Sequence, residues 1–353
     1  MNATMTPLPP HDDAPASAAA AAAAAAGQAQ LIDGFGRRIH YLRVSVTDRC
    51  DLRCNYCMPK DFKGFEEPAN WLSHAEMARL IGLFVQLGVN KVRLTGGEPL
   101  TRRGVVELAE RIGSMPQVRD LSLSTNGTML ARHASGLKAA GVKRLNVSLD
   151  SLDAATFAQI TGRDCLQDVL AGLNAARQAG FAPIKLNCVV HAQTPEPEVA
   201  RMLAYTLASG FILRLIETMP MGESGRQFQP ADLTQMGARL AKRFGLVPAL
   251  DIGDGGPARY WAAGQGAPAL GVITPMSQHF CATCNRVRLT VDGTLHLCLG
   301  QEDSVPLGRM LRQGADDAQL LAAIRAGIAA KPERHEFHSA PQRIVRFMSQ
   351  TGG

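Results

Sequence analysis

The feature that most restricts the fold of this chain is a repeated alternation of strand-like and helix-like runs, which begins near residue 40. The strand-like runs are YLRVSVT (41–47), KVRLT (91–95), DLSLS (120–124), RLNVSL (144–149), IKLNCVV (184–190) and ILRLIE (212–217). Helix-like stretches such as SHAEMARLIGLFVQLG and LQDVLAGLNAARQAG lie between them. Six βα units in succession predict an α/β fold with a parallel sheet and right-handed crossovers.

The pattern inside each strand indicates what the sheet encloses. Strands that helices cover on both faces are usually apolar throughout, but these alternate, and the first carries Arg43, Ser45 and Thr47 on one face. The apolar face packs against helices, so the polar face must line a wet or ligand-filled space. We therefore predict an incomplete, TIM-like (β/α)6 barrel, because a closed eight-stranded barrel fills its centre with side chains. An open sheet with one solvated face is the alternative.

The rest of the chain predicts a smaller C-terminal region packed on the barrel. It contains a helix in DLTQMGARLAKRFG (232–245), a Gly- and Pro-rich stretch (251–271) in which we interpret GDGGPA as a loop, and a helix near 316–330. A hairpin, RVRLTVDGTLHLCL, turns at Asp292-Gly293. The expected segments are a disordered Ala-rich tail (1–30), the barrel (31–225), the C-terminal region (226–340) and a tail ending in Gly-Gly (341–353).

Composition excludes some classes of function. No apolar run approaches the roughly 20 residues that span a bilayer, and residues 1–30 lack a secretory signal, so we expect a cytoplasmic protein without a membrane partner. The net charge is +6, with 29 arginines against 8 lysines, and arginine suits phosphates and carboxylates. Without a Lys/Arg-rich block, and with 4 Tyr and 2 Trp for base stacking, the chain is not expected to bind nucleic acid.

Six of the 8 cysteines fall into two groups of three. Cys50, Cys54 and Cys57 have the spacing C-x3-C-x2-C and follow the first strand, at the end where barrel active sites form. Three thiolates suit an iron–sulfur cluster with one open iron, whereas a structural zinc site needs four ligands. The spacing alone leaves both possibilities open. We expect the other two, Cys165 and Cys188, to be buried as small hydrophobic residues.

The second group consists of Cys281, Cys284 and Cys298. If the hairpin pairs Val291 with Thr294, Cys298 lies opposite Val287, three residues from Cys284. Three thiolates again come together without an obvious fourth. A Cys3His zinc site stays open here, because two histidines lie nearby in the sequence, His279 and His296.

Two of these motifs resemble the radical S-adenosylmethionine superfamily. The first is the C-x3-C-x2-C spacing with an aromatic residue, Tyr56, before the last cysteine, and the second is LTGGEPL (94–100) after the second strand. In that superfamily an open iron chelates the methionine part of the cofactor, and reduction of the cluster releases a 5′-deoxyadenosyl radical. The backbone of Gly96-Gly97 resembles the superfamily's binder of the methionine amino group.

A closer resemblance covers about residues 31–353. RVSVTDRCDLRCNYCMP, KVRLTGGEPL, STNG, NVSLDSLD, FCATCNRVRLTVDGTLHLCL and the terminal GG together resemble the GTP 3′,8-cyclase family of molybdenum cofactor biosynthesis. The resemblance implies two [4Fe–4S] clusters, each held by one cysteine group, with S-adenosyl-L-methionine as cofactor. It implies a lyase that abstracts the C3′ hydrogen of GTP and forms (8S)-3′,8-cyclo-7,8-dihydroguanosine 5′-triphosphate. The implied partners are a downstream cyclic pyranopterin monophosphate synthase, an electron donor such as flavodoxin or ferredoxin, and a second copy in a homodimer.

The resemblance also assigns side chains to the two small molecules. Its GTP contacts fall on Arg43, Arg93, Ser124, Lys185, Arg286 and Arg288. Strand periodicity independently turns Arg43, Arg93 and Lys185 inward, whereas the pair in NRVR would by itself indicate a solvated hairpin face. Ser124 stands where the family commonly has Thr. The cofactor contacts fall on Tyr56, Gly97, Ser148 and Met219, and Arg214 either pairs with the cofactor carboxylate or braces the lumen.

The chain ends in FMSQTGG, with no predicted helix for the glycines to cap. A frayed terminus is the ordinary interpretation, but the resemblance implies that Gly352 and Gly353 enter the barrel and are needed for cyclisation. Two other functions are weighed against the cyclase. One is another radical enzyme with an auxiliary cluster, such as a peptide maturase, and the other is a non-enzymatic module that binds zinc or nucleic acid.

Overall fold

The computed structural model describes residues 30–59, 68–249, 256–264 and 266–352. In the first part of the described chain, strands are followed by helices as the sequence predicts, with two helices between the fourth and fifth strands. The strands are β1 (Tyr41–Ser45), β2 (Lys91–Thr95), β3 (Asp120–Thr125), β4 (Arg144–Ser148), β5 (Ile184–Val190) and β6 (Ile212–Glu217). The helices are α2 (His74–Gln86), α3 (Val105–Gly113), α4 (Leu130–Ala139), α5 (Ala154–Thr161), α6 (Leu166–Gln178) and α7 (Glu196–Ser209), with a 3-10 turn, η1, at Pro99–Thr101.

The later part adds strands, helices and two 3-10 turns. The strands are β7 (Leu246–Ala249), β8 (Arg259–Ala263), β9 (Pro268–Ile273), β10 (Arg286–Leu289), β11 (Thr294–His296) and β12 (Ser304–Pro306). The helices are α8 (Gly222–Arg226), α9 (Leu233–Arg243), α10 (Leu307–Arg312), α11 (Asp317–Ala329) and α12 (Met348–Thr351). The turns are η2 (Cys281–Thr283) and η3 (Pro341–Arg343). None of the described helices is both long and apolar enough to cross a membrane.

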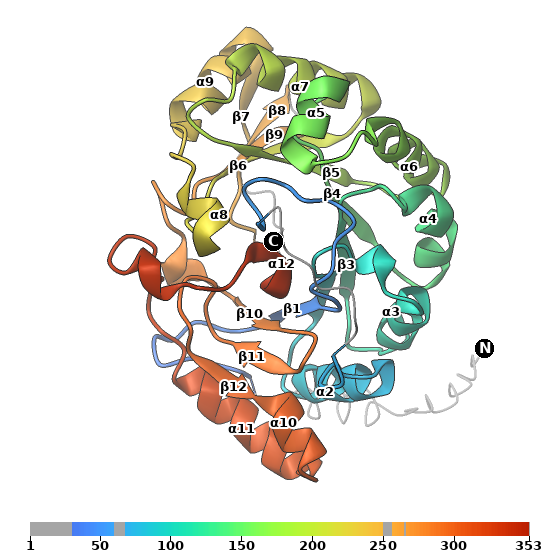
Figure 1. Cartoon of the computed structure of the whole chain (residues 1–353), viewed down its shortest axis with the longest axis vertical. Coiled ribbons are helices and arrows are strands. Elements are labelled where there is room, and N and C mark those ends of the chain that lie inside the picture. Colours follow the sequence, from blue (N-terminus) through green and yellow to red (C-terminus); the bar gives the residue numbers. More distant parts are fainter. Residues whose placement is uncertain (1–29, 60–67, 250–255, 265, 353) are drawn as a thin grey trace, which may run out of the picture.

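One mostly parallel sheet joins the two parts of the chain. Its strand order is β12-β11-β10-β1-β2-β3-β4-β5-β6-β9-β8-β7. The C-terminal region therefore extends the sheet at both edges, because β10 pairs in parallel with β1 and β9 pairs in parallel with β6. Figure 1 shows α2 to α7 on the outer side of the strands, while α12 lies in the space that the strands surround.

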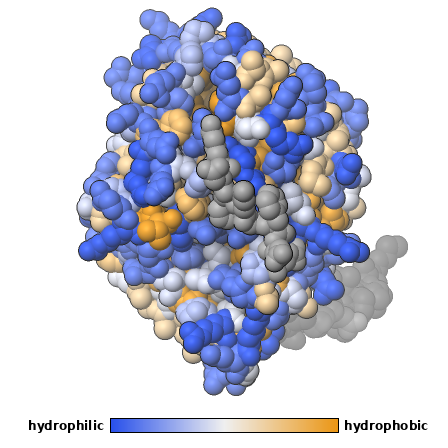
Figure 2. Space-filling model, viewed as in Figure 1, coloured by the Kyte–Doolittle hydropathy of each residue, from blue (hydrophilic) through white to orange (hydrophobic). Residues whose placement is uncertain are grey.

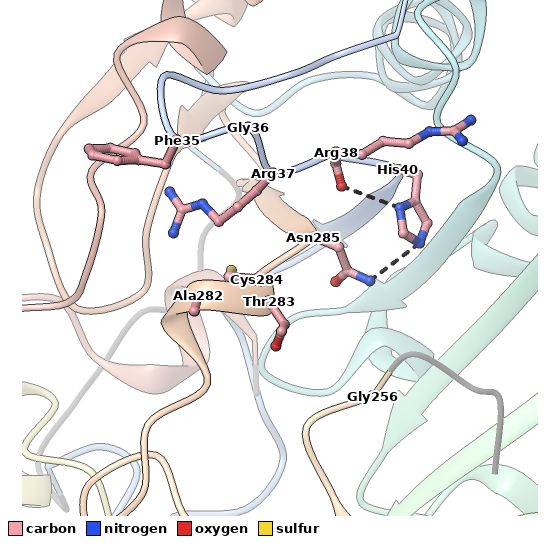
Figure 3. A pocket seen from close by; sticks show the side chains of 10 residues that line it. All are labelled: Phe35, Gly36, Arg37, Arg38, His40, Gly256, Ala282, Thr283, Cys284 and Asn285. Atoms are coloured by element: carbon pink, nitrogen blue, oxygen red, sulfur yellow. Dashed lines mark hydrogen bonds between the residues drawn. The ribbon is translucent and has the colours of Figure 1, made fainter. Parts of the chain in front are cut away.

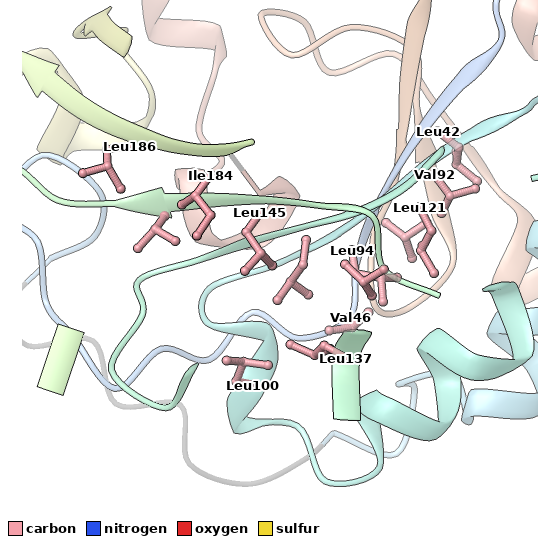
Figure 4. Packing of buried hydrophobic residues seen from close by; sticks show 14 of the residues in the cluster. Leu42, Val46, Val92, Leu94, Leu100, Leu121, Leu137, Leu145, Ile184 and Leu186 are labelled. Carbon is pink, nitrogen blue, oxygen red and sulfur yellow. The ribbon is translucent and has the colours of Figure 1, made fainter. Parts of the chain in front are cut away.

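The apolar faces of the strands pack against the helices. Leu42 of β1, Val92 of β2 and Leu121 of β3 are register neighbours and are almost completely buried. Figure 4 shows these side chains in one layer with residues from the helices, including Leu137. Burial of each large apolar side chain stabilises the fold by about 1.5–3 kcal/mol. On the outer surface visible in Figure 2, hydrophilic residues dominate and apolar residues form small separate groups.

In the C-terminal part of the chain, two strands were missed and one prediction is wrong. The Gly- and Pro-rich stretch contains two strands, β8 and β9, which the sequence pattern did not reveal. Within GDGGPA, the described residues Gly256 to Ala258 form neither strand nor helix, and the other three lie outside the described ranges. The prediction that the terminal glycines follow no helix is wrong, because Gly352 is the C-cap residue of α12.

The hairpin forms, but its register differs from the predicted one. Leu289 lies opposite Leu295 and Arg288 opposite His296, so that the ladder, if continued, would align Cys298 with Arg286 rather than Val287. The reason is a longer turn. The Thr290 N–H donates to the Thr294 carbonyl at 2.9 Å, and the Asp292 carboxylate accepts from the Thr294 backbone and hydroxyl.

Candidate active site

The polar faces of the strands line one large cavity. Its described lining contains nine Lys or Arg residues and a single acidic residue, Glu217. The cations are Arg43, Lys91, Arg93, Arg144, Lys185, Arg214, Arg286, Arg288 and Lys331. Glu217 is already engaged, since its carboxylate accepts hydrogen bonds from the backbone of Met276 and Ser277 and from the Ser277 hydroxyl. The cavity is therefore suited to a ligand with several negative charges.

The two cysteine groups lie at opposite ends of this cavity. The first group follows the C-terminal end of β1, whereas Cys281 and Cys284 precede the N-terminal end of β10, and these two strands are parallel neighbours. All six cysteines line the cavity. With a rise of about 3.3 Å per residue, a five-residue strand separates the two groups by roughly 15–20 Å. A ligand between them can face both.

The first cysteine group receives several hydrogen bonds to sulfur. Cys50 Sγ accepts from the Leu52 N–H at 3.4 Å and from Asn126 Nδ2 at 3.7 Å. Burial raises the pKa of Cys57 to about 12, and a hydrogen bond from the Ser349 backbone N–H partly opposes this. Sulfurs that accept N–H donors in a partly buried loop match the surroundings of an iron–sulfur cluster, whose potential such bonds tune.

The TGGEP turn lies directly beside this group. The Gly97 N–H donates to the Thr47 carbonyl at 2.9 Å, and the Glu98 N–H donates to the Arg49 carbonyl at 2.7 Å. A Cβ on Gly97 would lie 2.2 Å from the Arg49 carbonyl oxygen, so only glycine fits. Burial raises the pKa of Glu98 to about 7, while N–H groups of Asn126 and Leu100 donate to its carboxylate. By accepting these hydrogen bonds, the buried Glu98 carboxylate stabilises the conformation of the turn.

The other predicted cofactor contacts come together around this turn. Tyr56 Oη donates to Asp150 Oδ2 at 2.7 Å, and burial raises the pKa of that aspartate to about 6. Ser148, at the end of β4, and Met219, after β6, both line the cavity. Arg214 lines the same cavity and contacts neighbouring strands. Its guanidinium donates to Asn187 Oδ1 at 2.9 Å and to Asn146 Oδ1 at 2.5 Å.

All of the predicted GTP contacts line the cavity: Arg43, Arg93, Ser124, Lys185, Arg286 and Arg288. The buried atoms Arg43 Nε, Arg288 Nε and Ser124 Oγ of these contacts have no hydrogen-bond partner within the described residues. Burial, together with the like charge of Arg43, lowers the pKa of both Arg93 and Arg288 to about 9. Unpaired buried donors are costly, so this arrangement calls for a polar, anionic ligand.

The second cysteine group is more electropositive than the first. Burial opposes ionisation of Cys284, but the charges of Lys331 and Arg286 outweigh it and lower the pKa of the thiol. The His335 backbone N–H donates to Cys281. Neither His279 nor His296 lines the cavity. Among the described residues, no three His, Cys, Asp or Glu side chains stand close enough together to hold a single metal ion.

Sequence reasoning missed several residues of the cavity. Lys331, after α11, reaches the second cysteine group, where its Nζ donates to the Leu297 carbonyl. Tyr260 of β8 does not line the cavity itself, but its hydroxyl lies 3.3 Å from Nζ of Lys185, which does. No local pattern reveals either of these two. Lys91 shares the predicted polar strand face with Arg93 and does line the cavity. Tyr41 could have been found in the same way, because it lies two residues before Arg43.

A second cavity, of about 490 Å³, lies against the outer side of the second cysteine group. Figure 3 shows Arg37, Arg38 and His40 around it, with His40 hydrogen-bonded to the Arg38 carbonyl and to Asn285. Arg37 is anchored by Asp33 and by the carbonyl of Cys281. Cys284, Asn285 and Gly256 line both cavities and so form the wall between them.

Comparisons with known proteins agree along most of the chain. Residues 44–205 match the family model described as Radical SAM superfamily, and residues 211–337 match Molybdenum Cofactor Synthesis C. A protein of Pseudomonas aeruginosa named GTP 3′,8-cyclase 2 is 45% identical over 330 residues, covering 92% of this chain and 99% of its own. GTP 3′,8-cyclase of Caulobacter vibrioides is 45% identical over 355 residues, covering 98% of this chain and 100% of its own.

The solved structures provide a comparison of fold. Streptococcus suis SuiB bound to S-adenosylmethionine has a TM-score of 0.59 with this chain at 13% identity, covering 82% of this chain and 68% of SuiB. SuiB bound to the precursor peptide SuiA also has a TM-score of 0.59, at 15% identity. These values show a shared α/β architecture and no more, so they do not support a peptide as the substrate of this chain.

Proposed function

This chain belongs to the GTP 3′,8-cyclase family, and we propose that its central cavity holds GTP between two iron–sulfur clusters. The activity of the family is the first step of molybdenum cofactor biosynthesis, in which a radical S-adenosylmethionine enzyme converts GTP to (8S)-3′,8-cyclo-7,8-dihydroguanosine 5′-triphosphate. S-adenosylmethionine supplies the 5′-deoxyadenosyl radical that takes the C3′ hydrogen. The residues of the chain must therefore bind, orient and shield the two small molecules.

The main support for placing GTP in the cavity is the excess of positive charge among its lining residues. Nine cations face one carboxylate that is already hydrogen-bonded. A triphosphate supplies about four negative charges and many acceptor oxygens, which arginine forks bind well. We assign Arg43, Arg93, Ser124, Lys185, Arg286 and Arg288 to GTP. The unpaired donors of Arg43 and Arg288 support this assignment.

We assign one [4Fe–4S] cluster to each cysteine group. Cys50, Cys54 and Cys57 would hold the cluster that works with S-adenosylmethionine, and the N–H donors around them fit such a group. Tyr56, Gly97, Ser148 and Met219 would hold the cofactor, with Arg214 bracing the wall of the lumen. Cys281, Cys284 and Cys298 would hold the second cluster, and its open position would face the guanine of GTP.

The finer statements about architecture and partners belong to the same proposal. We propose that β1 to β6 form an incomplete (β/α)6 barrel over residues 31–225, that residues 226–340 carry the second cluster, and that 341–353 form a functional tail. We also propose a homodimer, an electron donor such as flavodoxin or ferredoxin, and delivery of product to a cyclic pyranopterin monophosphate synthase. A cytoplasmic location fits eight unpaired cysteines, six of which must stay reduced to bind iron.

Anaerobic purification with iron and sulfide counting tests this proposal. We expect roughly eight irons per chain, because each three-cysteine group would hold a four-iron cluster. Adding GTP should then couple cleavage of S-adenosylmethionine to formation of the cyclised nucleotide. About four irons per chain would contradict the second cluster. Zinc in place of iron would contradict both cluster assignments.

Replacing Arg286 or Arg288 with Ala should weaken GTP binding by about 1.5–3 kcal/mol, the contribution of a charge-assisted hydrogen bond. The loss should shrink when guanosine replaces GTP, since guanosine has no phosphate. Equilibrium binding to the iron-loaded enzyme measures the affinities for GTP and for guanosine. Arg309→Ala is the matched control, because Arg309 is exposed on α10 and its removal changes the net charge equally. Equal losses for GTP and guanosine would indicate a structural role for the pair.

A further inference from the structure

Tyr41 occupies a position in the cavity that the resemblance to known cyclases does not explain. It is the first residue of β1, and its side chain lines the cavity on the same face as Arg43. The Arg43 side chain donates a hydrogen bond to the Tyr41 hydroxyl oxygen, and the buried hydroxyl makes no other hydrogen bond within the described part of the chain. Because arginine can only donate, the hydroxyl proton lacks an acceptor there, and a bound ligand can supply one.

Cations surround the Tyr41 ring. The guanidinium carbons of Arg93, Arg43 and Arg286 lie 5.4, 5.6 and 5.7 Å from its centroid. Arg286 on β10 and Lys91 on β2 are also its register neighbours on the two adjoining strands. Cation–π contact explains why a neutral aromatic ring is stable here. The same three guanidinium groups repel one another, and a polyanion among them would relieve that repulsion.

The charges around Tyr41 also change its acidity. Burial raises the pKa of the hydroxyl, but Arg93, Arg43 and Arg286 outweigh it and lower the value to about 8. The charged residues facing it are Arg43 on its own strand, Arg286 and Arg288 on β10, and Lys91 and Arg93 on β2. The nearest acidic residue on the next strand, Asp120 of β3, is paired with Arg144. Tyr41 therefore changes charge at a lower pH than its neighbours Arg93 and Arg288, whose pKa values are about 9.

We propose that Tyr41 is a further binding residue for the substrate, and that its neutral hydroxyl donates a hydrogen bond to the triphosphate held by Arg43, Arg93 and Arg286. An ionised Tyr41 can no longer donate, and its negative charge instead pairs with the cations that the phosphates need. When Tyr41 is ionised, GTP binding requires that its hydroxyl takes up a proton. The affinity for GTP therefore declines as the pH rises through the pKa of Tyr41 in the free enzyme. This inference rests on the proposed position of the triphosphate.

Tyr41→Phe tests the proposal, because phenylalanine keeps the ring and its cation–π contacts and removes only the hydroxyl. At pH 7 we expect GTP to bind the iron-loaded Tyr41→Phe enzyme roughly ten- to a hundredfold more weakly than the wild type. Inorganic triphosphate should lose affinity likewise, while guanosine changes less than about twofold. Iron content and melting temperature establish that the variant is folded and loaded.

The pH dependence provides a readout that a merely structural role would not give. Above pH 8, wild-type affinity for GTP should decrease by up to about tenfold per pH unit, since each bound GTP takes up one proton. Tyr41→Phe should show no such additional decrease. Equal losses for GTP and guanosine, or the same alkaline decrease in Tyr41→Phe, would overturn the role of Tyr41.

Arg288→Ala separates failure of this inference from failure of the proposed function. If Arg288→Ala weakens GTP binding and Tyr41→Phe does not, the triphosphate site stands and the role of Tyr41 is refuted. If neither variant weakens GTP binding, the triphosphate lies elsewhere, and both assignments are overturned. If both variants bind GTP and inorganic triphosphate more weakly but bind guanosine unchanged, the triphosphate site and the role of Tyr41 are both supported.

Discussion

Replacing Cys54 with Ala should abolish cleavage of S-adenosylmethionine, whereas replacing Cys298 with Ala should leave cleavage but stop cyclisation. The two cysteines belong to groups at opposite ends of the cavity, so each variant removes one proposed cluster and leaves the other. Without the second cluster the substrate loses its positioned guanine, and the radical has no aligned C3′ hydrogen to take. We expect uncoupled release of 5′-deoxyadenosine from Cys298→Ala.

The measurements are iron content, 5′-deoxyadenosine and cyclised product for each purified variant. Each substitution should remove about four irons per chain. Cys165→Ala is the matched control, because that thiol is 5% exposed in the apolar core and belongs to neither group. It should retain full iron content and both products. Cyclised product from Cys298→Ala at the wild-type rate would refute the assignment of the second cluster.

Strand periodicity was enough to predict how the cavity is lined. Arg43, Arg93 and Lys185 each alternate with apolar neighbours, and the structure places all three in the cavity. The alternation works because a strand has only two faces, and the helices outside accept only the apolar one. Tyr41 has the same phase as Arg43. A strand pattern does not identify an aromatic residue as a ligand contact. The role of Tyr41 was therefore inferred only from the three arginines that surround its ring in the structure.

Errors arose where the structure depends on contacts remote in the sequence. The hairpin register was predicted from a two-residue Asp-Gly turn, but the Asp292 side chain closes a longer turn and shifts the ladder by one residue. Strands β8 and β9 were missed because their composition is typical of loops. They form because β6 offers an edge to β9. Lys331 approaches the second cysteine group only after α11 has docked, which no local pattern specifies.

The tail illustrates both the strength and the limit of sequence reasoning. Its proximity to the active site was expected from the resemblance, while its local conformation was not. The Ser349 N–H donates to Cys57, and Met348 lines the cavity. Gly352 has φ +69, and a Cβ there would lie 2.3 Å from Thr95 Cγ2, next to the TGGEP turn. Gly353 lies outside the described residues. The tail therefore contacts both elements assigned to the first cluster and its cofactor.

Deleting Gly352 and Gly353, or appending a C-terminal tag, should reduce cyclised product by about a hundredfold or more, since small displacements of a reacting group have effects of that size. Folding and both clusters should survive, because Ser349 and the rest of α12 remain. Gly352→Ala should also be impaired, as it combines backbone strain at positive φ with a clash against Thr95. Gly314→Ala is its control, with φ +88 and no atom within 4 Å of the added Cβ.

Iron content, melting temperature and cyclised product distinguish the possible roles of the tail. A loss of product with unchanged iron and melting temperature would place the glycines in the active site. It would also indicate that they act on the substrate or cofactor rather than on the fold. If Gly314→Ala lowers product as much as Gly352→Ala, backbone strain alone accounts for the effect. Wild-type turnover in the truncated chain would refute the role of the tail and make it an ordinary frayed terminus.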